Sequence, residues 1–197
     1  MNDEKILYEE DAARIVGENV VIPEGYTEIA CGAFAIFEYL GYDIKTVTFP
    51  ESLRSIGADA FSGNYSLKTV MVPKNLTNID PEAFRRCDAL VSYHVDSENP
   101  VYADVDGVLF CKDKTVLKRY PQGRKVKSYT VPDGVNSLGK GAFYHCDSIT
   151  HISIPKNVQH IEDAFTFCNG LKTISVAKDN PVYSDEDGVL LIKIKQN

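Results

Sequence analysis

An eleven-residue phrase with acidic residues at metal-binding spacing occurs twice in the chain. It reads NPVYADVDGVL over residues 99–109 and NPVYSDEDGVL over residues 180–190. Each copy contains Asp-x-Asp-Gly, a spacing seen in calcium loops, but calcium needs about six to eight oxygen ligands. A tyrosine stands where an EF-hand loop has another acid, and apolar Gly-Val-Leu follows at once. Because Asp-Gly also forms turns, we interpret the phrase as a turn that starts a strand and expect no metal ion.

The cysteines are the second group that could do chemistry. Their number, five, is odd, and no C-x-x-C pair is present. Three of them share one slot, three residues after the phenylalanine of an Ala-Phe pair, and Asn64 fills the same slot elsewhere: Cys87, Cys146 and Cys168. A residue that recurs in register is a packing position, and buried thiols behave as small apolar groups. We expect these three to be reduced and buried, and Cys31 and Cys111 to be the more reactive.

A catalytic arrangement is not visible in the sequence. His145 precedes Cys146 and His160 lies near Cys168, but no third group is placed to orient either histidine. The four histidines lack the H-E-x-x-H spacing of zinc hydrolases, and no P-loop or G-x-G-x-x-G is present. We therefore expect no enzyme activity and no cofactor.

Composition excludes several other classes. Apolar residues make up 44% and charged residues 25%, as in soluble globular proteins, and the net charge of −7 argues against nucleic-acid binding. The apolar runs are shorter than the roughly 20 residues that cross a bilayer, so we expect no membrane insertion. The first residues lack the basic start and apolar stretch of a signal peptide. With unpaired thiols, this favours the cytoplasm for the chain as given, or the cell surface or secretion if an export segment was removed.

A short repeat organises the chain. Segments 47–69, 70–92 and 129–151 are equal in length, and each carries alternating apolar residues, a proline, an aliphatic residue six positions later and then Ala-Phe. A fourth copy at 152–173 is one residue shorter, and a looser copy starts at Val20. Because one such turn cannot bury its own apolar side, stacked turns forming a solenoid are the expected solution.

The eleven-residue phrase lies in a longer turn, which is itself repeated. Aligning Asn99 with Asn180 maps 84–110 onto 165–191, with nearly half of the aligned residues identical. We divide the chain into an N-terminal cap at 1–19 and a solenoid of about seven turns at 20–197. The long turn covers 96–131, and a partial second one begins at 177.

The fold that follows is mostly β, with a parallel sheet on one face and short helical or irregular turns on the other. Strands are expected near 20–22, 47–49, 70–72, 93–95, 129–131, 152–154 and 174–176. The Ala-Phe phenylalanines are expected to form an internal column: Phe34, Phe61, Phe84, Phe143 and Phe165.

The repeat resembles the BspA-type leucine-rich repeat of bacteria, with its h-x-I-P, Ala-Phe-x-x-Cys and Leu positions, over about residues 20–192. The resemblance implies a right-handed leucine-rich-repeat superhelix. It also implies a β-hairpin after each NPxY phrase, a binding function, a bacterial surface or secreted location, and no catalytic activity. In this chain the first turn is longer than the pattern, and two turns lack the proline.

The long turn is predicted to carry an antiparallel hairpin of residues 107–111 and 115–120 that projects from the solenoid. In the second copy, residue 197 corresponds to residue 116, so the counterpart of the return strand is not in the sequence. We expect either an exposed last strand, whose free edge could form a homodimer, or a chain that continues beyond this segment.

The outward positions of the sheet are the candidate binding surface, rich in lysine, threonine and serine, with Met71 and two histidines as exceptions. They are Lys45, Thr46, Thr48, Lys68, Thr69, Met71, Ser92, His94, Lys127, Ser128, Thr130, Thr150, His151, Ser153, Lys172, Thr173 and Ser175. Solenoids commonly bind through such a face. We expect a protein partner, with carbohydrate as the alternative. A solvated sheet face without a partner would show the same composition.

Overall fold

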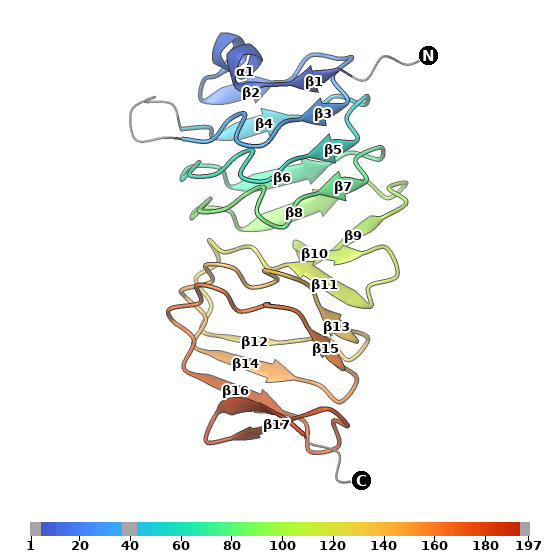
Figure 1. The fold of residues 1–197 in the computed structure, drawn as a ribbon, viewed down its shortest axis with the longest axis vertical. Coiled ribbons are helices and arrows are strands. Elements are labelled where there is room, and N and C mark those ends of the chain that lie inside the picture. Colours follow the sequence, from blue (N-terminus) through green and yellow to red (C-terminus); the bar gives the residue numbers. More distant parts are fainter. Residues whose placement is uncertain (1–4, 37–42, 194–197) are drawn as a thin grey trace.

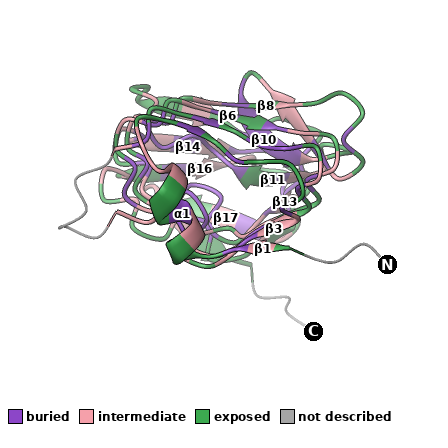
Figure 2. Cartoon of the chain, turned by 90° about the horizontal axis from the view of Figure 1, so that it is seen from above, coloured by how far each residue is buried: buried purple, intermediate pink, exposed green. Residues whose placement is uncertain are grey.

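The computed structural model describes residues 5–36 and 43–193, and these form a solenoid (Figure 1). Successive turns stack along one axis, with the N-terminus at one end and the C-terminus at the other. Seen along that axis, one row of strands lies on one side and a second row on the other, with buried residues between them (Figure 2).

The first row contains the seven strands that the repeat predicts, each within one residue of the expected position. They are β2 (Asn19–Val21), β4 (Thr46–Thr48), β6 (Thr69–Val72), β8 (Ser92–Val95), β12 (Ser128–Thr130), β14 (His151–Ile154) and β16 (Thr173–Val176). Neighbouring strands pair in parallel, with core residues in register, such as Val20 with Val47 and Ile152 with Ile174. The row is divided into the ladders β2–β4, β6–β8 and β12–β14–β16.

A second row of short parallel strands, not foreseen from the sequence, runs along the opposite side. It contains β1 (Ile6–Leu7), β3 (Glu28–Ile29), β5 (Ser55–Ile56), β7 (Asn78–Ile79), β11 (Val116–Arg119), β13 (Ser137–Leu138) and β15 (His160–Ile161). The aliphatic residue six positions after each proline lies here and points inward, as Ile29, Ile56 and Leu138 do. Most of these strands have only two residues, and the row is interrupted after β7.

The expected column of aromatic rings forms, but as two stacks. Phe34, Phe61 and Phe84 stack with ring centroids 5.1 and 5.3 Å apart, and Phe143 lies 5.6 Å from Phe165. Tyr120 occupies the next place in the second stack, 5.6 Å from Phe143. Its segment reads Arg-Tyr-Pro-Gln-Gly instead of Ala-Phe-x-x-Cys, which hid it in the sequence.

The predicted hairpin is present as β10 (Val108–Cys111) paired antiparallel with β11, but it does not project from the solenoid. Val108, Leu109, Phe110 and Leu117 are all buried, because the long turn crosses the interior. On its other side β10 pairs with β9 (Tyr102–Val105), and we call the β9–β10 pair the first septum. Its counterpart, β17 (Tyr183–Glu186) with β18 (Val189–Ile192), is the second septum.

The first septum divides the apolar core in two. Leu109 packs into a cluster formed by the preceding turns, whereas Val108 and Phe110 pack into the cluster of the following turns. Successive side chains of a strand point to opposite faces, so one strand serves both cores. We call the two parts the N-terminal half and the C-terminal half.

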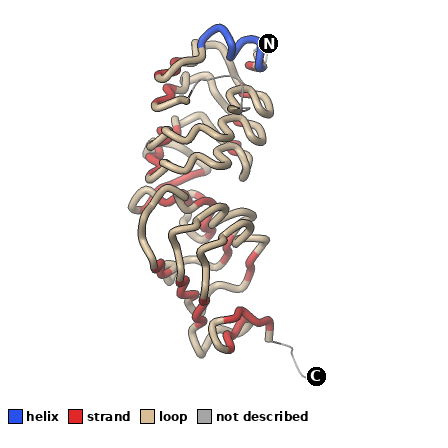
Figure 3. Tube along the Cα trace, turned by 90° about the vertical axis from the view of Figure 1, so that its left-hand side faces the viewer, coloured by secondary structure: helices blue, strands red, loops and turns tan. Residues whose placement is uncertain are grey.

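One helix is present in the described ranges, α1 (Glu9–Ile15), and it covers the N-terminal end (Figure 3). Its buried residue, Ala12, contacts the core of the N-terminal turns. Its three acidic residues lie in the first turn, where they interact favourably with the helix dipole. The Ala-Phe segments, for which helical or irregular geometry was expected, are turns.

Candidate binding surface

In the repeated phrase the asparagine and the first aspartate make structural hydrogen bonds with their side chains. Asn99 is fully buried, and its side-chain amide donates to the carbonyl oxygens of Pro73 and Leu76 at 2.8 and 2.9 Å. Its Oδ1 accepts the backbone N–H groups of Val101 and Tyr102. The amide therefore joins the long turn to the turn before it.

The first aspartate of each Asp-x-Asp-Gly also has a hydrogen-bond partner within the protein. Oδ1 of Asp104 accepts the backbone N–H of Val95 at 2.8 Å, and Asp185 accepts that of Val176 at 2.7 Å. These bonds fix each septum to the first-row strand before it. Within the described ranges no three His, Cys, Asp or Glu side chains lie close enough together to hold a metal ion.

The Asp-Gly pair makes the tight turn between the septum strands. Asp106 and Gly107 have φ of 48° and 73°, and the carbonyl of Gly107 accepts the N–H of Tyr93. A Cβ on Gly107 would lie 2.8 Å from the Cβ of Ser92. Glycine is required both by the left-handed backbone and by this close approach to β8.

The recurring cysteine slot joins successive turns. The thiols of Cys87, Cys146 and Cys168 contact the carbonyl oxygens of Phe61, Tyr120 and Phe143, respectively, and Asn64 donates to Phe34 and Phe61 from the same slot. Burial raises the pKa of Cys87 to about 12 and that of Cys168 to about 11. A high pKa leaves little thiolate at neutral pH, so these thiols are poor nucleophiles.

The five thiols are free, and Cys87 and Cys146 are buried as expected. Cys168 is only partly buried, which corrects the expectation for the third slot. Its ring neighbour Phe165 is also partly exposed, because no further Ala-Phe turn follows it in the stack.

The predicted surface residues all lie on the first row of strands or immediately before them. Eleven are exposed, namely Lys45, Thr46, Thr48, Lys68, Met71, His94, Lys127, Ser128, Thr130, Lys172 and Thr173. Six are partly buried, namely Thr69, Ser92, Thr150, His151, Ser153 and Ser175. The row brings them together on one face, which the tip of the first septum divides at Gly107.

In the C-terminal half of this face the polar side chains bond to one another. Nδ1 of His151 lies 2.8 Å from Oγ1 of Thr173, and its Nε2 lies 3.1 Å from Oγ of Ser153 and 3.2 Å from that of Ser175. These groups form an internal polar ladder. They have less unused hydrogen-bonding capacity to offer a partner than isolated side chains would.

The N-terminal half of the face is more apolar than the sequence columns suggested. Met71 is 56% exposed, and Val21 on the same outward column is 64% exposed. Val21 was missed because it belongs to the loose first copy of the repeat, although its place in β2 matches that of Met71 in β6. Lys45, in contrast, pairs with Glu18 at 2.8 Å.

Two hollows flank this column. The first, of about 270 Å³, lies at the carboxyl ends of the strands and is lined by Val47, Thr48, Phe49, Met71, Val72, Pro73, His94, Val95 and Asp96. The second, of about 540 Å³, lies at the amino ends and includes Lys45, Tyr65, Lys68 and Thr69. We call Val21, Met71, His94, Lys68 and the two hollows the N-terminal face.

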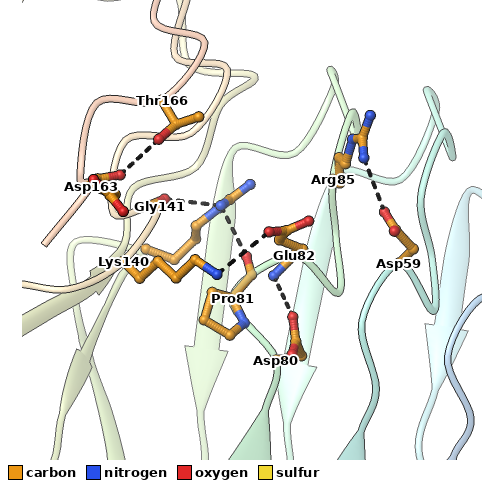
Figure 4. A network of polar contacts seen from close by, with 10 residues as sticks. Asp59, Asp80, Pro81, Glu82, Arg85, Lys140, Gly141, Asp163 and Thr166 are labelled. Carbon is orange, nitrogen blue, oxygen red and sulfur yellow. Dashed lines mark hydrogen bonds and ion pairs between the residues drawn. The ribbon is translucent and has the colours of Figure 1, made fainter.

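The break in the second row forms another hollow of about 540 Å³, between the two halves. Charged groups pair across this junction, as Lys140 and Glu82 do in Figure 4. Nζ of Lys140 lies 3.9 Å from Oε1 of Glu82. Arg119, only 5% exposed, donates to the carbonyl oxygens of Pro81 and Gly141 and to Oε1 of Gln122. The hollow mixes both charge signs, and its buried cation, Arg119, already bonds to carbonyl oxygens of both halves.

No described helix is long and apolar enough to cross a membrane. The sequence matches the description "BspA type Leucine rich repeat region" in six copies, over residues 16–103 and 120–186. No curated protein matches significantly.

Several solved bacterial structures are similar. A leucine-rich cell surface protein from Faecalibacterium prausnitzii is 31% identical with a TM-score of 0.66, over 85% of this chain and 43% of that one. A leucine-rich repeat protein from Eubacterium ventriosum is 25% identical with a TM-score of 0.60, over 81% and 54%. The pneumococcal vaccine antigen PcpA, 23% identical with a TM-score of 0.59 over 88% and 55%, shares the fold.

The chain spans about half the length of these structures. The family match covers most of the sequence, and its two spans contain all seven strands of the first row. The chain therefore belongs to the BspA-type leucine-rich-repeat family.

Proposed function

We propose that this chain is a non-enzymatic module that binds a protein partner through the N-terminal face. BspA-type repeats are repeat modules, and the family is generally non-catalytic. The observation that carries the proposal is the exposed side chain of Met71, which lines one of the two hollows and lies on the same outward column as the exposed Val21.

The chemistry of this face resembles that of protein interfaces, where an apolar centre is surrounded by polar residues. Methionine adapts its shape to an irregular apolar partner. Lys68 is exposed and lies beside the larger hollow, so a partner with a carboxylate near its apolar contact fits best. The expected partner surface is an apolar side chain or loop with acidic neighbours.

The C-terminal half provides a matched control, because Thr130 lies on the corresponding outward column of β12 and is exposed. Partners captured by the immobilised chain are identified by mass spectrometry, and their affinity is then measured with purified proteins. Met71→Glu is expected to weaken binding by about tenfold or more, as for a central interface residue, and Thr130→Glu to leave it nearly unchanged.

A double change, Lys68→Glu with Lys127→Glu, separates the two halves further. We expect Lys68→Glu alone to account for most of the loss, since Lys127 lies beyond the septum. If Met71→Glu and the lysine variants keep their circular dichroism spectrum and bind with unchanged affinity, the proposed face is wrong.

Carbohydrate binding is the second candidate, favoured by one observation outside the strand columns. Phe167 is 54% exposed, and its ring stacks on that of His145 with centroids 5.3 Å apart. A hollow of about 350 Å³ beside it is lined by Arg86, Asp147 and Asn169, among others. A glycan array tests this candidate, and binding that Phe167→Ala abolishes while Met71→Glu does not would assign it to this hollow.

A further inference from the structure

The second septum exposes a surface whose counterpart in the first septum is buried. Val189 is 60% exposed, whereas Val108, at the equivalent position of the first copy, is 1% exposed. Leu191 is 39% exposed, whereas the corresponding Phe110 is 1% exposed. The two copies have the same hairpin register, so the difference lies in what covers them.

Strand alternation shows which way these side chains point. Val108 and Phe110 face the C-terminal core, and Leu109 faces the N-terminal core. In the second septum Leu190 packs against the C-terminal core, so Val189 and Leu191 face away from it, at the end of the molecule where β17 lies in Figure 1. The first septum shows that this side is built to support a second apolar layer.

The β17 strand of the second septum carries two polar residues where the first septum has apolar ones. Val105 is replaced by Glu186, and Ala103 by Ser184. The β17 side of the second septum has therefore become polar, as suits a surface that meets water or a polar rim.

A cation lies at the other end of the same surface. Lys193 follows β18 and is exposed. Its backbone N–H bonds to the carbonyl of Val182, which continues the pairing of the hairpin, so strand alternation assigns Lys193 to the side of Val189 and Leu191. Its ammonium group donates to the carbonyl oxygen of Asn180, which leaves two of its three N–H donors and its charge available. We call Glu186, Val189, Leu191 and Lys193 the end face: an acid at the turn, two apolar residues, then a base.

This pattern is complementary to itself when two copies meet antiparallel. Val189 of one copy then lies against Leu191 of the other, and Glu186 lies against Lys193 at both ends. A two-fold interface uses the same patch on both subunits, so each attractive pair occurs twice. A parallel arrangement would instead place like charges together.

We propose that two copies of this chain associate through the end face, septum against septum. The alternative of pairing the free edges of two β18 strands would leave Val189 and Leu191 exposed, so burial favours the face over the edge. The contact is small for a protein interface, so we expect a weak dimer that dissociates on dilution. This proposal does not depend on the N-terminal face.

Sedimentation equilibrium of the full chain over a range of concentrations tests the proposal. The mass is expected to rise from 21.9 kDa toward twice that value as concentration increases. Leu191→Glu is expected to abolish the rise, because it buries an unpaired acid against its own copy. Met71→Glu, an equally drastic change at an exposed residue of the sheet face, is expected to leave it unchanged.

A charge exchange gives the sharper test. Glu186→Lys alone and Lys193→Glu alone are each expected to weaken association severalfold, because each creates like-charge contacts across the interface. The double variant restores opposite charges across the two-fold axis and is expected to recover most of the association. A monomer at every concentration, or single and double variants that weaken association equally, would overturn the proposal.

Discussion

Asn99 and Asn180 occupy equivalent positions in the two copies of the repeated phrase and make the same hydrogen bonds. Each side-chain amide donates to two carbonyl oxygens of the preceding turn, and each Oδ1 accepts two backbone N–H groups of its own turn. Both are fully or almost fully buried. The duplicated phrase is thus a duplicated joint between turns.

We expect Asn99→Ala to lower the free energy of unfolding by about 3 kcal/mol, because it leaves several buried backbone groups without partners. Urea unfolding followed by circular dichroism measures this. Asn157→Ala, at an exposed residue with one bond to the carbonyl of Asp133, is the control and is expected to cost less than about 1 kcal/mol. Equal losses in the two variants would contradict the assigned role.

Asn180→Ala is expected to act locally instead. It lies in the last described turn, and in a solenoid each turn contacts only its neighbours. Hydrogen exchange is expected to accelerate in β17 and β18 while the N-terminal half stays protected. Faster exchange in β2 and β4 would show that the turns are coupled over a longer range than we infer.

Gly107→Ala tests the close approach of the septum turn to β8. We expect a loss of about 2–3 kcal/mol, of which roughly 1 kcal/mol reflects the left-handed backbone and the rest the close contacts with the side chains of Ser92 and Arg124. Ser92→Gly in the same chain removes only the contact with the Cβ of Ser92 and leaves the Arg124 contact and the backbone strain, so the double variant is expected to recover only part of the loss. A double-mutant cycle with no coupling would rule out the contact.

Thiol labelling separates the cysteines by position. Cys31 is exposed and is expected to react first with an excess of iodoacetamide at neutral pH, whereas Cys87 and Cys146 react last. Cys168 and Cys111 are expected to fall between them, since both are partly buried. Mass spectrometry of peptides after timed quenching gives the order, and equally rapid labelling of all five would refute it.

Stability is expected to fall at alkaline pH. Burial raises the pKa of Cys87 from 9.0 to about 12 in the folded protein, so between these values the folded chain keeps a proton that the unfolded chain has lost. The contribution is complete below about pH 9 and is lost as pH rises toward 12. Cys87→Ala is expected to flatten this dependence in part, because burial also raises the pKa of Cys168 and that of Tyr129. Urea unfolding followed at several alkaline pH values measures the effect.

Arg119 is expected to couple the unfolding of the two halves. Arg119→Met removes the bonds to Pro81 and Gly141, which belong to different halves, and we expect the single urea transition to broaden or divide into two. Arg119→Lys is expected not to rescue it, because an ammonium group cannot reproduce the planar fork of the guanidinium. An unchanged transition slope in both variants would show that the septum alone couples the halves.

The first row of strands was predictable because its strands alternate apolar and outward-facing residues at a recurring spacing, and five of the seven are followed by a proline. The second row was not, because a strand such as Ile6–Leu7 leaves no alternation to detect. The hairpin of residues 107–111 and 115–120 was expected to project, because the repeat period does not show that the long turn passes through the interior. The pairing of β10 with β9, which makes the septum, was not foreseen.

For the candidate surface, too, one part could be predicted from the sequence and another could not. Its residues lie on or immediately before the first row of strands, as the period predicts, because strand alternation decides which side chains point outward. Their role in binding stays a prediction. The internal polar ladder around His151 and the hollows beside Met71 depend on side-chain geometry between turns, which period does not encode. The end face required the structure, since only burial distinguishes Val189 from Val108.

The ladders of both rows have their hydrogen bonds directed from turn to turn, along the long axis of the molecule. Tension applied between its two ends would therefore load these bonds in line and open them one rung at a time, as in peeling, rather than shear a whole sheet at once. Such a rod yields early and extends in steps. The long turn that contains the first septum is bonded to the preceding turn by Asn99 and to both halves by Arg119. We expect this turn to open at a higher force than its neighbours.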